Sequence, residues 1–173
     1  MLYMKSEGEV SEFDGSEVLI FPLTIEELKF LYEDKTGFEK YINLQYDGGN
    51  IKDLLKGIKF QMQEKYPSDW IYNTCWLVVS LVNKNIVGTI SFKGCPQNGR
   101  VEICYEIGKN YQNRGYGTIA VELICNFAKN NEIKVVKANC LNSNIASQKV
   151  LSKNNFRIIK EDNSIIYFEK EIL

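Results

Sequence analysis

The 173-residue sequence is long enough to bury a sizeable core and fits a single domain over residues 1–173. Apolar residues make up 45% and charged residues 25%, and the net charge of −1 provides no electrostatic footprint for nucleic acid. No apolar run approaches the ~20 residues that span a bilayer, and the first residues soon turn acidic, so we expect a cytoplasmic protein without a membrane or nucleic-acid partner.

The first part of the chain predicts a short strand at residues 18–21, followed by a helix. Thr24 and Glu27 have the spacing of a capping box, in which each side chain bonds the other's backbone N–H, and the helix should continue through Leu28 and Leu31. After a break at residues 47–50, apolar residues resume helical spacing and predict another helix to about residue 66.

The middle of the chain predicts a β-hairpin. Residues 75–82 form a nearly continuous apolar run, which is typical of a strand buried on both faces. A tight turn at 83–85 leads to a return strand at 86–92, and a loop at 94–99 precedes a further strand at 101–107.

Helices and strands alternate in the remaining sequence, where helices are expected at 117–129 and 144–154 and strands at 133–141, 156–160 and 165–168. The order predicts an α+β fold, in which an antiparallel meander runs into a βαβ unit with parallel strands.

The loop between the strand at 101–107 and the next helix predicts a binding site for a diphosphate. It contains Q-N-R-G-Y-G at residues 112–117. A helix N-terminus presents unpaired N–H groups, and glycines at 115 and 117 with positive φ would let these groups converge on one anion. Arg114 can add a charge-assisted contact, and Gln112 can support the loop or the ligand with its amide.

Three interpretations of these glycines compete on the residues alone. The Gly-Lys-Ser/Thr of a nucleotide triphosphatase loop is missing. The dinucleotide pattern G-x-G-x-x-A is present at 115–120, but seven residues separate it from the strand and residues 135–137 lack the expected acidic side chain. The third interpretation is a plain loop whose glycines only cap a helix.

The same loop also resembles the Q/R-x-x-G-x-G/A loop of the GCN5-related N-acetyltransferases (GNAT). Residues 101–107, V-E-I-C-Y-E-I, resemble the preceding strand of the family's ribosomal-protein N-acetyltransferase-like branch, which tends to read V-E-I-G-Y. Residues 144–156, N-I-A-S-Q-K-V-L-S-K-N-N-F, resemble that branch's N-x-x-S…V-L-x-K-x-G-F segment. The three segments occur in the family's order.

The resemblance implies a mixed central sheet of about six to seven strands, splayed between the fourth and fifth strands and flanked by helices. It implies acetyl-CoA as the acyl donor and no metal. The pyrophosphate would bind the N–H groups of residues 114–118, the N–H of Ile107 would polarise the thioester carbonyl, and Asn144 would bond the pantetheine arm. The implied cofactor-binding residues are Ile107, Gln112, Arg114, Gly115, Tyr116, Gly117, Thr118 and Asn144.

The sequence contains no histidine, so histidine-dependent nucleophilic sites are excluded and a carboxylate is the simplest general base. Glu102 occupies the position of a glutamate often proposed as the base in the resembling branch, although a strand-edge carboxylate that is paired with a lysine or solvated is an equal interpretation. Glu106, two residues on, is a weaker candidate. Ser147 is either the acid toward the departing thiolate or an ordinary serine in the first turn of a helix.

Three positions depart from the family pattern. Leu151 stands where many members have a tyrosine acid, Asn155 replaces a glycine and must be left-handed to do so, and Tyr116 stands where a basic residue is common. The expected activity is acetyl transfer to a primary amine, a small molecule or a peptide, by direct attack in a ternary complex. A non-catalytic acyl-CoA-binding regulator and a dinucleotide-binding protein are the alternatives.

Overall fold

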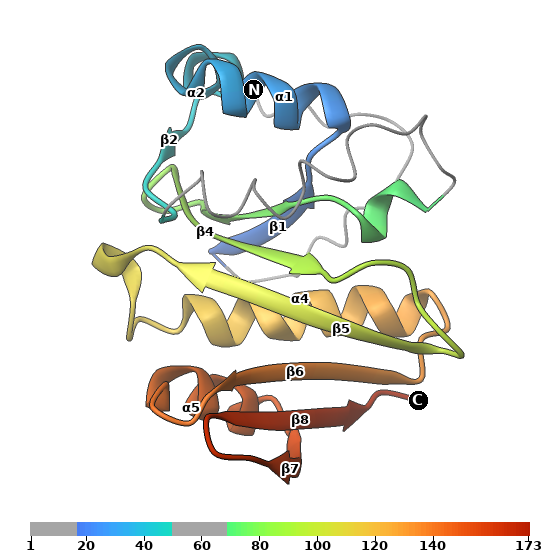
Figure 1. Ribbon diagram of the computed structural model, residues 1–173. Helices are drawn as coiled ribbons and strands as arrows, with labels where there is room; N and C mark the ends of the chain where they lie inside the picture. The colour runs from blue at the N-terminus through green and yellow to red at the C-terminus, as the bar shows by residue number, and fades with distance from the viewer. Residues whose placement is uncertain (1–16, 50–68) are drawn as a thin grey trace.

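The computed structural model describes residues 17–49 and 69–173 (Figure 1). These residues form one eight-stranded sheet with helices on both faces, which confirms the predicted α+β class. The strands are β1 (Val18–Pro22), β2 (Gln45–Tyr46), β3 (Trp76–Ser80), β4 (Asn85–Phe92), β5 (Arg100–Ile107), β6 (Val135–Leu141), β7 (Arg157–Glu161) and β8 (Ile165–Glu171). The α-helices are α1 (Ile25–Glu33), α2 (Lys35–Ile42), α4 (Tyr116–Asn130) and α5 (Ile145–Lys153), and the 3₁₀ turns are η1 (Trp70–Tyr72) and η2 (Lys109–Tyr111).

The sheet opens between β5 and β6. The strand order is β1-β3-β4-β5-β6-β8-β7, with β2 beside β4. β5 and β6 run parallel, as predicted for the βαβ unit, but they pair only from Arg100 and Val135 to Glu102 and Lys137. Beyond these residues the two strands diverge toward their carboxyl ends (Figure 1). With the two-residue β2 set aside, β5 and β6 are the fourth and fifth strands, so the predicted splay is confirmed.

The N-terminal helices follow from local capping. The Thr24 hydroxyl accepts the N–H of Glu27 at 3.2 Å, and the Glu27 carboxylate accepts the N–H of Thr24 at 2.8 Å, which confirms the capping box. Asp34 then caps a second helix, α2, through the N–H of Gly37. The sequence analysis did not predict α2. The helix predicted at residues 51–66 lies outside the described residues.

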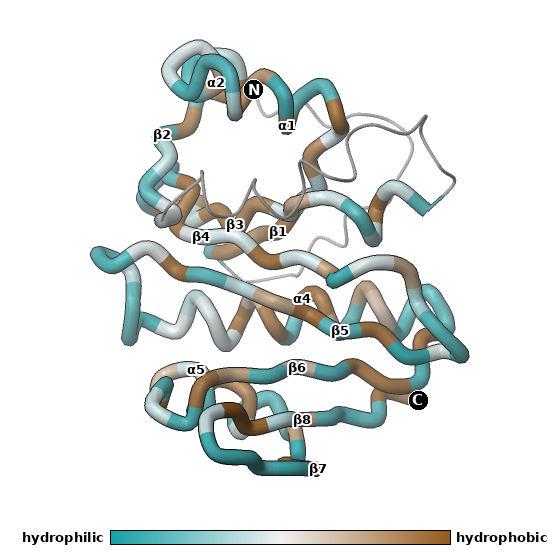
Figure 2. The backbone as a smooth tube through the Cα atoms, viewed as in Figure 1, coloured by the Kyte–Doolittle hydropathy of each residue, from teal (hydrophilic) through white to brown (hydrophobic). Residues whose placement is uncertain are grey.

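Two apolar cores cover the two faces of the sheet. On one face α4 lies across β1, β4 and β5 (Figure 1). The buried residues of α4 are almost all apolar and recur at helical spacing, so they line one side of the helix, and Figure 2 shows hydrophobic residues along it. On the other face α1 and α2 pack Leu28, Leu31 and Phe38 against β3. Every residue of β3 is buried because both faces of that strand are covered, as the apolar run at 75–82 predicted, but the strand ends at Ser80 and Leu81 and Val82 are exposed.

The last two strands are arranged differently from their order along the chain. β8 lies between β6 and β7 and runs antiparallel to both, so β7 is the edge strand and all its residues are exposed. The sequence analysis predicted both strands but not this order. No helix in the described ranges is long and apolar enough to cross a membrane.

Candidate cofactor and catalytic site

One edge of β5 is left open by the divergence of β6. Lys93 N–H donates to the carbonyl of Glu102 at 2.7 Å, and Gly108 N–H donates to the carbonyl of Val87 at 2.9 Å. Even-numbered residues of β5 therefore direct their backbone groups toward β4. The alternate residues direct theirs to the opposite edge, where β6 pairs only as far as Glu102.

The open stretch of this edge consists of Ile103, Tyr105 and Ile107. The side-chain amide of Gln112 donates to the carbonyl of Ile107 at 3.0 Å, so Gln112 ties the following loop to the end of the strand. In the part of the chain that the structure describes, no strand covers the remaining groups. Such an edge can pair with an extended molecule that enters the gap.

The loop after β5 ends in an uncapped helix N-terminus. Gly115 is the N-cap residue of α4 and, having no side chain, provides no cap. The first backbone bond inside the helix runs from the N–H of Ile119 to the carbonyl of Gly115. The N–H groups of Tyr116, Gly117 and Thr118 have no acceptor among residues 17–49 and 69–173. Together with the helix dipole, they form a site suited to an anion.

The two loop glycines differ in backbone conformation and in what a side chain would contact. Gly115 has φ 90° and ψ −15°, and a Cβ built there would meet nothing within 4 Å, so only backbone conformation selects glycine. Gly117 is helical and buried, and a Cβ there would lie 3.5 Å from Ile107 and from Val150. The prediction of positive φ is correct for Gly115 and wrong for Gly117, which is helical and where an added Cβ would make only ordinary van der Waals contacts.

Tyr116 is half-buried against the protein, whereas the loop side chains of Gln112, Asn113 and Arg114 are exposed. The Tyr116 hydroxyl donates to Ser80 Oγ at 3.1 Å and accepts the Asn83 amide at 3.0 Å, so Tyr116 can offer a ligand its backbone and not its hydroxyl. The Arg114 guanidinium lies 5.9 Å from the centre of the Tyr111 ring and is exposed beside the helix N-terminus. Arg114 therefore adds a positive charge to the loop immediately before the unpaired N–H groups.

The first turn of α5 faces the same gap. Asn144 caps this helix, with its side-chain oxygen accepting the N–H of Ser147 at 3.0 Å. Ser147 Oγ lies 2.8 Å from the hydroxyl of Tyr105, and burial raises the pKa of Tyr105 to about 12. Leu151 is fully buried in the core. Asn155 has φ 62°, so it adopts the left-handed conformation that its replacement of glycine requires.

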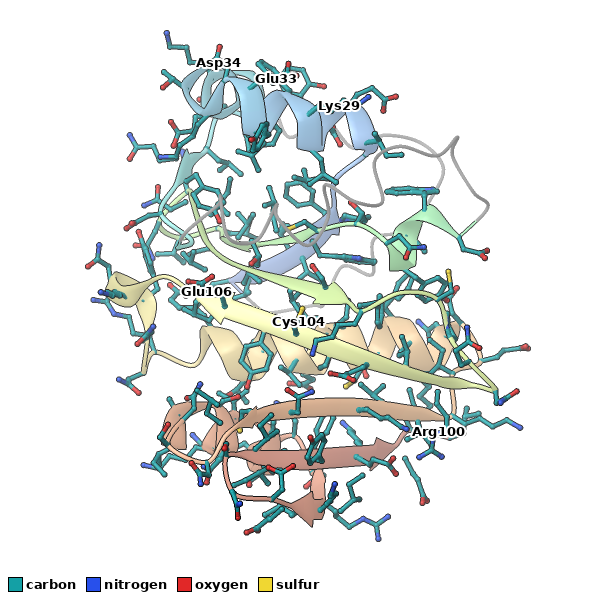
Figure 3. The ribbon with its side chains drawn as sticks, in the orientation of Figure 1. Lys29, Glu33, Asp34, Arg100, Cys104 and Glu106 are labelled. Carbon is teal, nitrogen blue, oxygen red and sulfur yellow. The ribbon has the colours of Figure 1, made fainter. Side chains whose placement is uncertain are left out.

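Glu102, Cys104 and Glu106 are alternate residues of β5 and therefore share one face of the strand, and Figure 3 labels Cys104 and Glu106. Glu102 Oε1 accepts Lys93 at 2.5 Å and the amide of Asn139 at 2.6 Å, so the interpretation of Glu102 as a lysine-paired carboxylate matches the observed geometry. Glu106 is exposed and has no ion pair or hydrogen bond within the described part of the chain.

The structure therefore brings the predicted site residues to one gap, with Ile107, Gln112 and residues 114–118 on one side and Asn144 and Ser147 on the other. Glu102 lies farther back, where β5 still pairs with β6. Tyr105, whose hydroxyl contacts Ser147 Oγ, lies in the same gap and was not among the predicted residues. Its signal was available, since Tyr105 is the tyrosine of the V-E-I-C-Y strand.

Comparison with known proteins agrees with this geometry. The sequence model of a family described as "Acetyltransferase (GNAT) domain" matches residues 18–157. The uncharacterized N-acetyltransferase YjdG of Bacillus subtilis (strain 168) is 35% identical over 83 residues, which are 47% of this chain and 49% of that protein. The match thus spans about half the length of this curated relative.

Two solved structures share the fold. A ribosomal-protein-S5-alanine acetyltransferase from Vibrio fischeri is 14% identical and superimposes with a TM-score of 0.61, covering 92% of this chain and 95% of its own. The N-acetyltransferase PseH of Campylobacter jejuni, in complex with acetyl coenzyme A, is 20% identical with a TM-score of 0.57, covering 89% of this chain and 98% of its own.

Proposed function

Because the chain belongs to the GNAT acetyltransferase family, we propose that it is an N-acetyltransferase that passes the acetyl group of acetyl-CoA directly to a primary amine. One observation carries the proposal: the open edge of β5 leads straight to the uncapped N-terminus of α4. An extended amide arm that ends in a diphosphate has the shape and chemistry to occupy both. Since all described strands join one sheet, we treat residues 1–173 as a single acetyltransferase domain.

In this proposal the pyrophosphate binds the N–H groups of residues 114–118, and the Arg114 guanidinium adds positive charge. Gln112 holds the loop in place through its bond to Ile107. The pantetheine arm pairs with the open edge of β5, and the side chain of Asn144 bonds it from α5. The N–H of Ile107 donates to the thioester carbonyl and stabilises the charge that develops on its oxygen during attack.

The chemical step needs a proton acceptor for the amine and a hydrogen-bond donor for the leaving thiolate. The amine nitrogen attacks the thioester carbon, a C–N bond forms, the C–S bond breaks and CoA leaves as a thiolate. The nitrogen loses its surplus proton to a base, for which we propose Glu102, and the Ser147 hydroxyl donates a hydrogen bond to the departing sulfur. The Oε1 atom of Glu102 already binds Lys93 and Asn139, so Oε2 would take the proton, through a water.

Glu106 is the competing base, because it has no cation beside it within the described residues and lies nearer to Ile107 on the strand. Kinetics of the matched variants Glu102→Gln and Glu106→Gln decide between them. A general base is worth about 10²–10⁴-fold, so the variant that removes it should lose that much in kcat/KM and recover partly at high pH. If Glu102→Gln retains wild-type turnover at every pH, Glu102 is not the base.

The acceptor is proposed to be a primary amine on a small molecule or a peptide. Glu106 is exposed on β5 and, within the described residues, has no ion pair, so it gives this face a negative charge that suits an amine arriving as an ammonium ion.

Two measurements test the proposed function. Acetyl-CoA should raise the melting temperature, because it binds only the native state, whereas NADH should not. Free thiol released from acetyl-CoA with a panel of primary amines should show turnover. Binding without turnover on any amine would favour a non-catalytic acyl-CoA-binding regulator. Stabilisation by NADH alone would favour a dinucleotide-binding protein.

A further inference from the structure

Tyr105 spans the gap between β5 and α5. Its hydroxyl lies 2.8 Å from Ser147 Oγ, where either oxygen can donate, and 3.3 Å from the Ser147 carbonyl oxygen, so its single proton can go to either acceptor of Ser147. Its ring passes the first turn of α4, where a Cβ built on Gly117 would lie 3.8 Å from Cε2. One aromatic side chain thus connects the anion-binding turn of α4 with the first turn of α5.

When an anion forms beside Ser147, the hydroxyls of Tyr105 and Ser147 can donate in one direction, from Tyr105 to Ser147 and from Ser147 to the anion. Burial raises the pKa of Tyr105 to about 12, so its hydroxyl keeps its proton at neutral pH and acts as a donor. When Tyr105 donates to Ser147 Oγ, the proton of Ser147 is free for a third group. A thiolate attracts that proton, and the bond from Tyr105 strengthens the one from Ser147, because hydrogen bonds in a chain polarise one another.

The other described residues near Ser147 cannot donate a strong hydrogen bond to its hydroxyl oxygen. Leu151, on the same helix as Ser147, has no hydroxyl and is buried in the core. The Cys140 thiol on β6 is a second neighbour of Ser147, and burial raises its pKa, so it stays a neutral thiol. Among the described residues near Ser147, the Tyr105 hydroxyl is therefore the strong donor that can hydrogen-bond to Ser147 Oγ and orient it.

We propose that Tyr105 is a positioning residue that directs the Ser147 hydroxyl toward the sulfur of the departing CoA. The inference rests on the proposed acetyl transfer and adds a residue to it. No proton leaves Tyr105 permanently: the thiolate accepts a hydrogen bond from Ser147, which lowers the barrier to C–S cleavage, and takes its final proton from solvent.

The variant Tyr105→Phe tests the proposal, because it removes one oxygen and keeps the ring that packs on Gly117. Loss of one hydrogen bond should lower kcat by about 3–10-fold, with the KM for acetyl-CoA within about twofold of the wild type. Ser147→Ala should lower kcat by at least as much. The double variant should be no slower than Ser147→Ala, because Tyr105 acts only through Ser147.

Cys140→Ala is the matched control, since it removes the other neighbour of Ser147 and should leave kcat unchanged. Wild-type kcat in Tyr105→Phe, losses that multiply in the double variant, or an equal loss in Cys140→Ala would each overturn the role of Tyr105. If the wild type releases no thiol with any amine, the proposed function fails and this inference fails with it. If the wild type turns over and only the Tyr105 pattern is absent, the acetyl transfer stands.

Discussion

The left-handed residue at the start of α4 allows a quantitative test of the phosphate-binding loop. Gly115 has φ 90°, and a Cβ at this position would touch nothing within 4 Å. Replacement by alanine therefore adds no clash and removes no contact. The change acts only through the backbone, since an L-residue in this conformation costs about 1–2 kcal/mol.

This conformational free energy can lower either the stability of the fold or the affinity for acetyl-CoA. If the loop keeps its conformation, the free energy of unfolding falls by about 1–2 kcal/mol, and the melting temperature falls by about 2–8 °C for a chain of this size. If the loop relaxes instead, binding must restore the left-handed residue, and the Kd for acetyl-CoA rises by about 5–30-fold. The losses in unfolding and binding free energy should together amount to about 1–2 kcal/mol.

Thermal unfolding and calorimetric titration with acetyl-CoA measure the two parts. Gly117→Ala is the control, because Gly117 is helical and a Cβ there makes only ordinary contacts at 3.5 Å. Alanine should be tolerated at 117 or should stabilise the helix by up to about 1 kcal/mol, with little change in affinity. If Gly115→Ala matches the wild type in both measurements, the left-handed residue is not what shapes the anion site.

Three further predictions concern stability. Thr24→Ala removes the capping box of α1 and should cost about 1 kcal/mol, seen as a melting temperature lower by about 2–4 °C; an unchanged value would mean that the cap contributes nothing. Asn155→Ala places an unsuited residue at φ 62° and should cost about 1–2 kcal/mol in denaturant unfolding, whereas Asn155→Gly should not. Arg100 holds the pKa of Glu169 below its usual value of 4.5, so this pair stabilises the fold above that pH and ceases to do so as the pH falls. The wild type should therefore melt above Glu169→Gln at pH 7, and the difference should shrink on acidification; a difference that grows in acid would contradict the assignment.

Features set by neighbouring residues in the chain were predictable from sequence. The bonds between Thr24 and Glu27 depend only on a three-residue spacing, and the left-handed Asn155 follows from the end of a helix. The strand β3 was recognisable because covering both faces of a strand requires an apolar run without alternation. In each case the residues that cause the feature lie within a few positions of one another in the sequence.

Features set across the sheet were not predictable in the same way. The place of β8 between β6 and β7 depends on which edges remain free after the chain has folded, and no local pattern encodes that choice. The pairing of Glu102 with Lys93 and Asn139 requires β4 and β6 to flank β5 in the observed register. Sequence reasoning named Glu102 as a candidate, but its neighbours needed the structure.

The location of the site follows from two sets of backbone groups that the fold leaves unpaired. An open strand edge and an uncapped helix N-terminus each leave N–H groups that a protein usually pairs or covers. Here they belong to β5 and α4, which only the loop containing η2 separates, and Gln112 ties this loop to Ile107. Because β6 pairs with β5 only as far as Glu102, the open edge of β5 begins beyond this residue and runs toward α4. An extended ligand with amides along its arm and a diphosphate at its end would satisfy both sets at once, so the unpaired groups argue for a cofactor of that form independently of any single side chain.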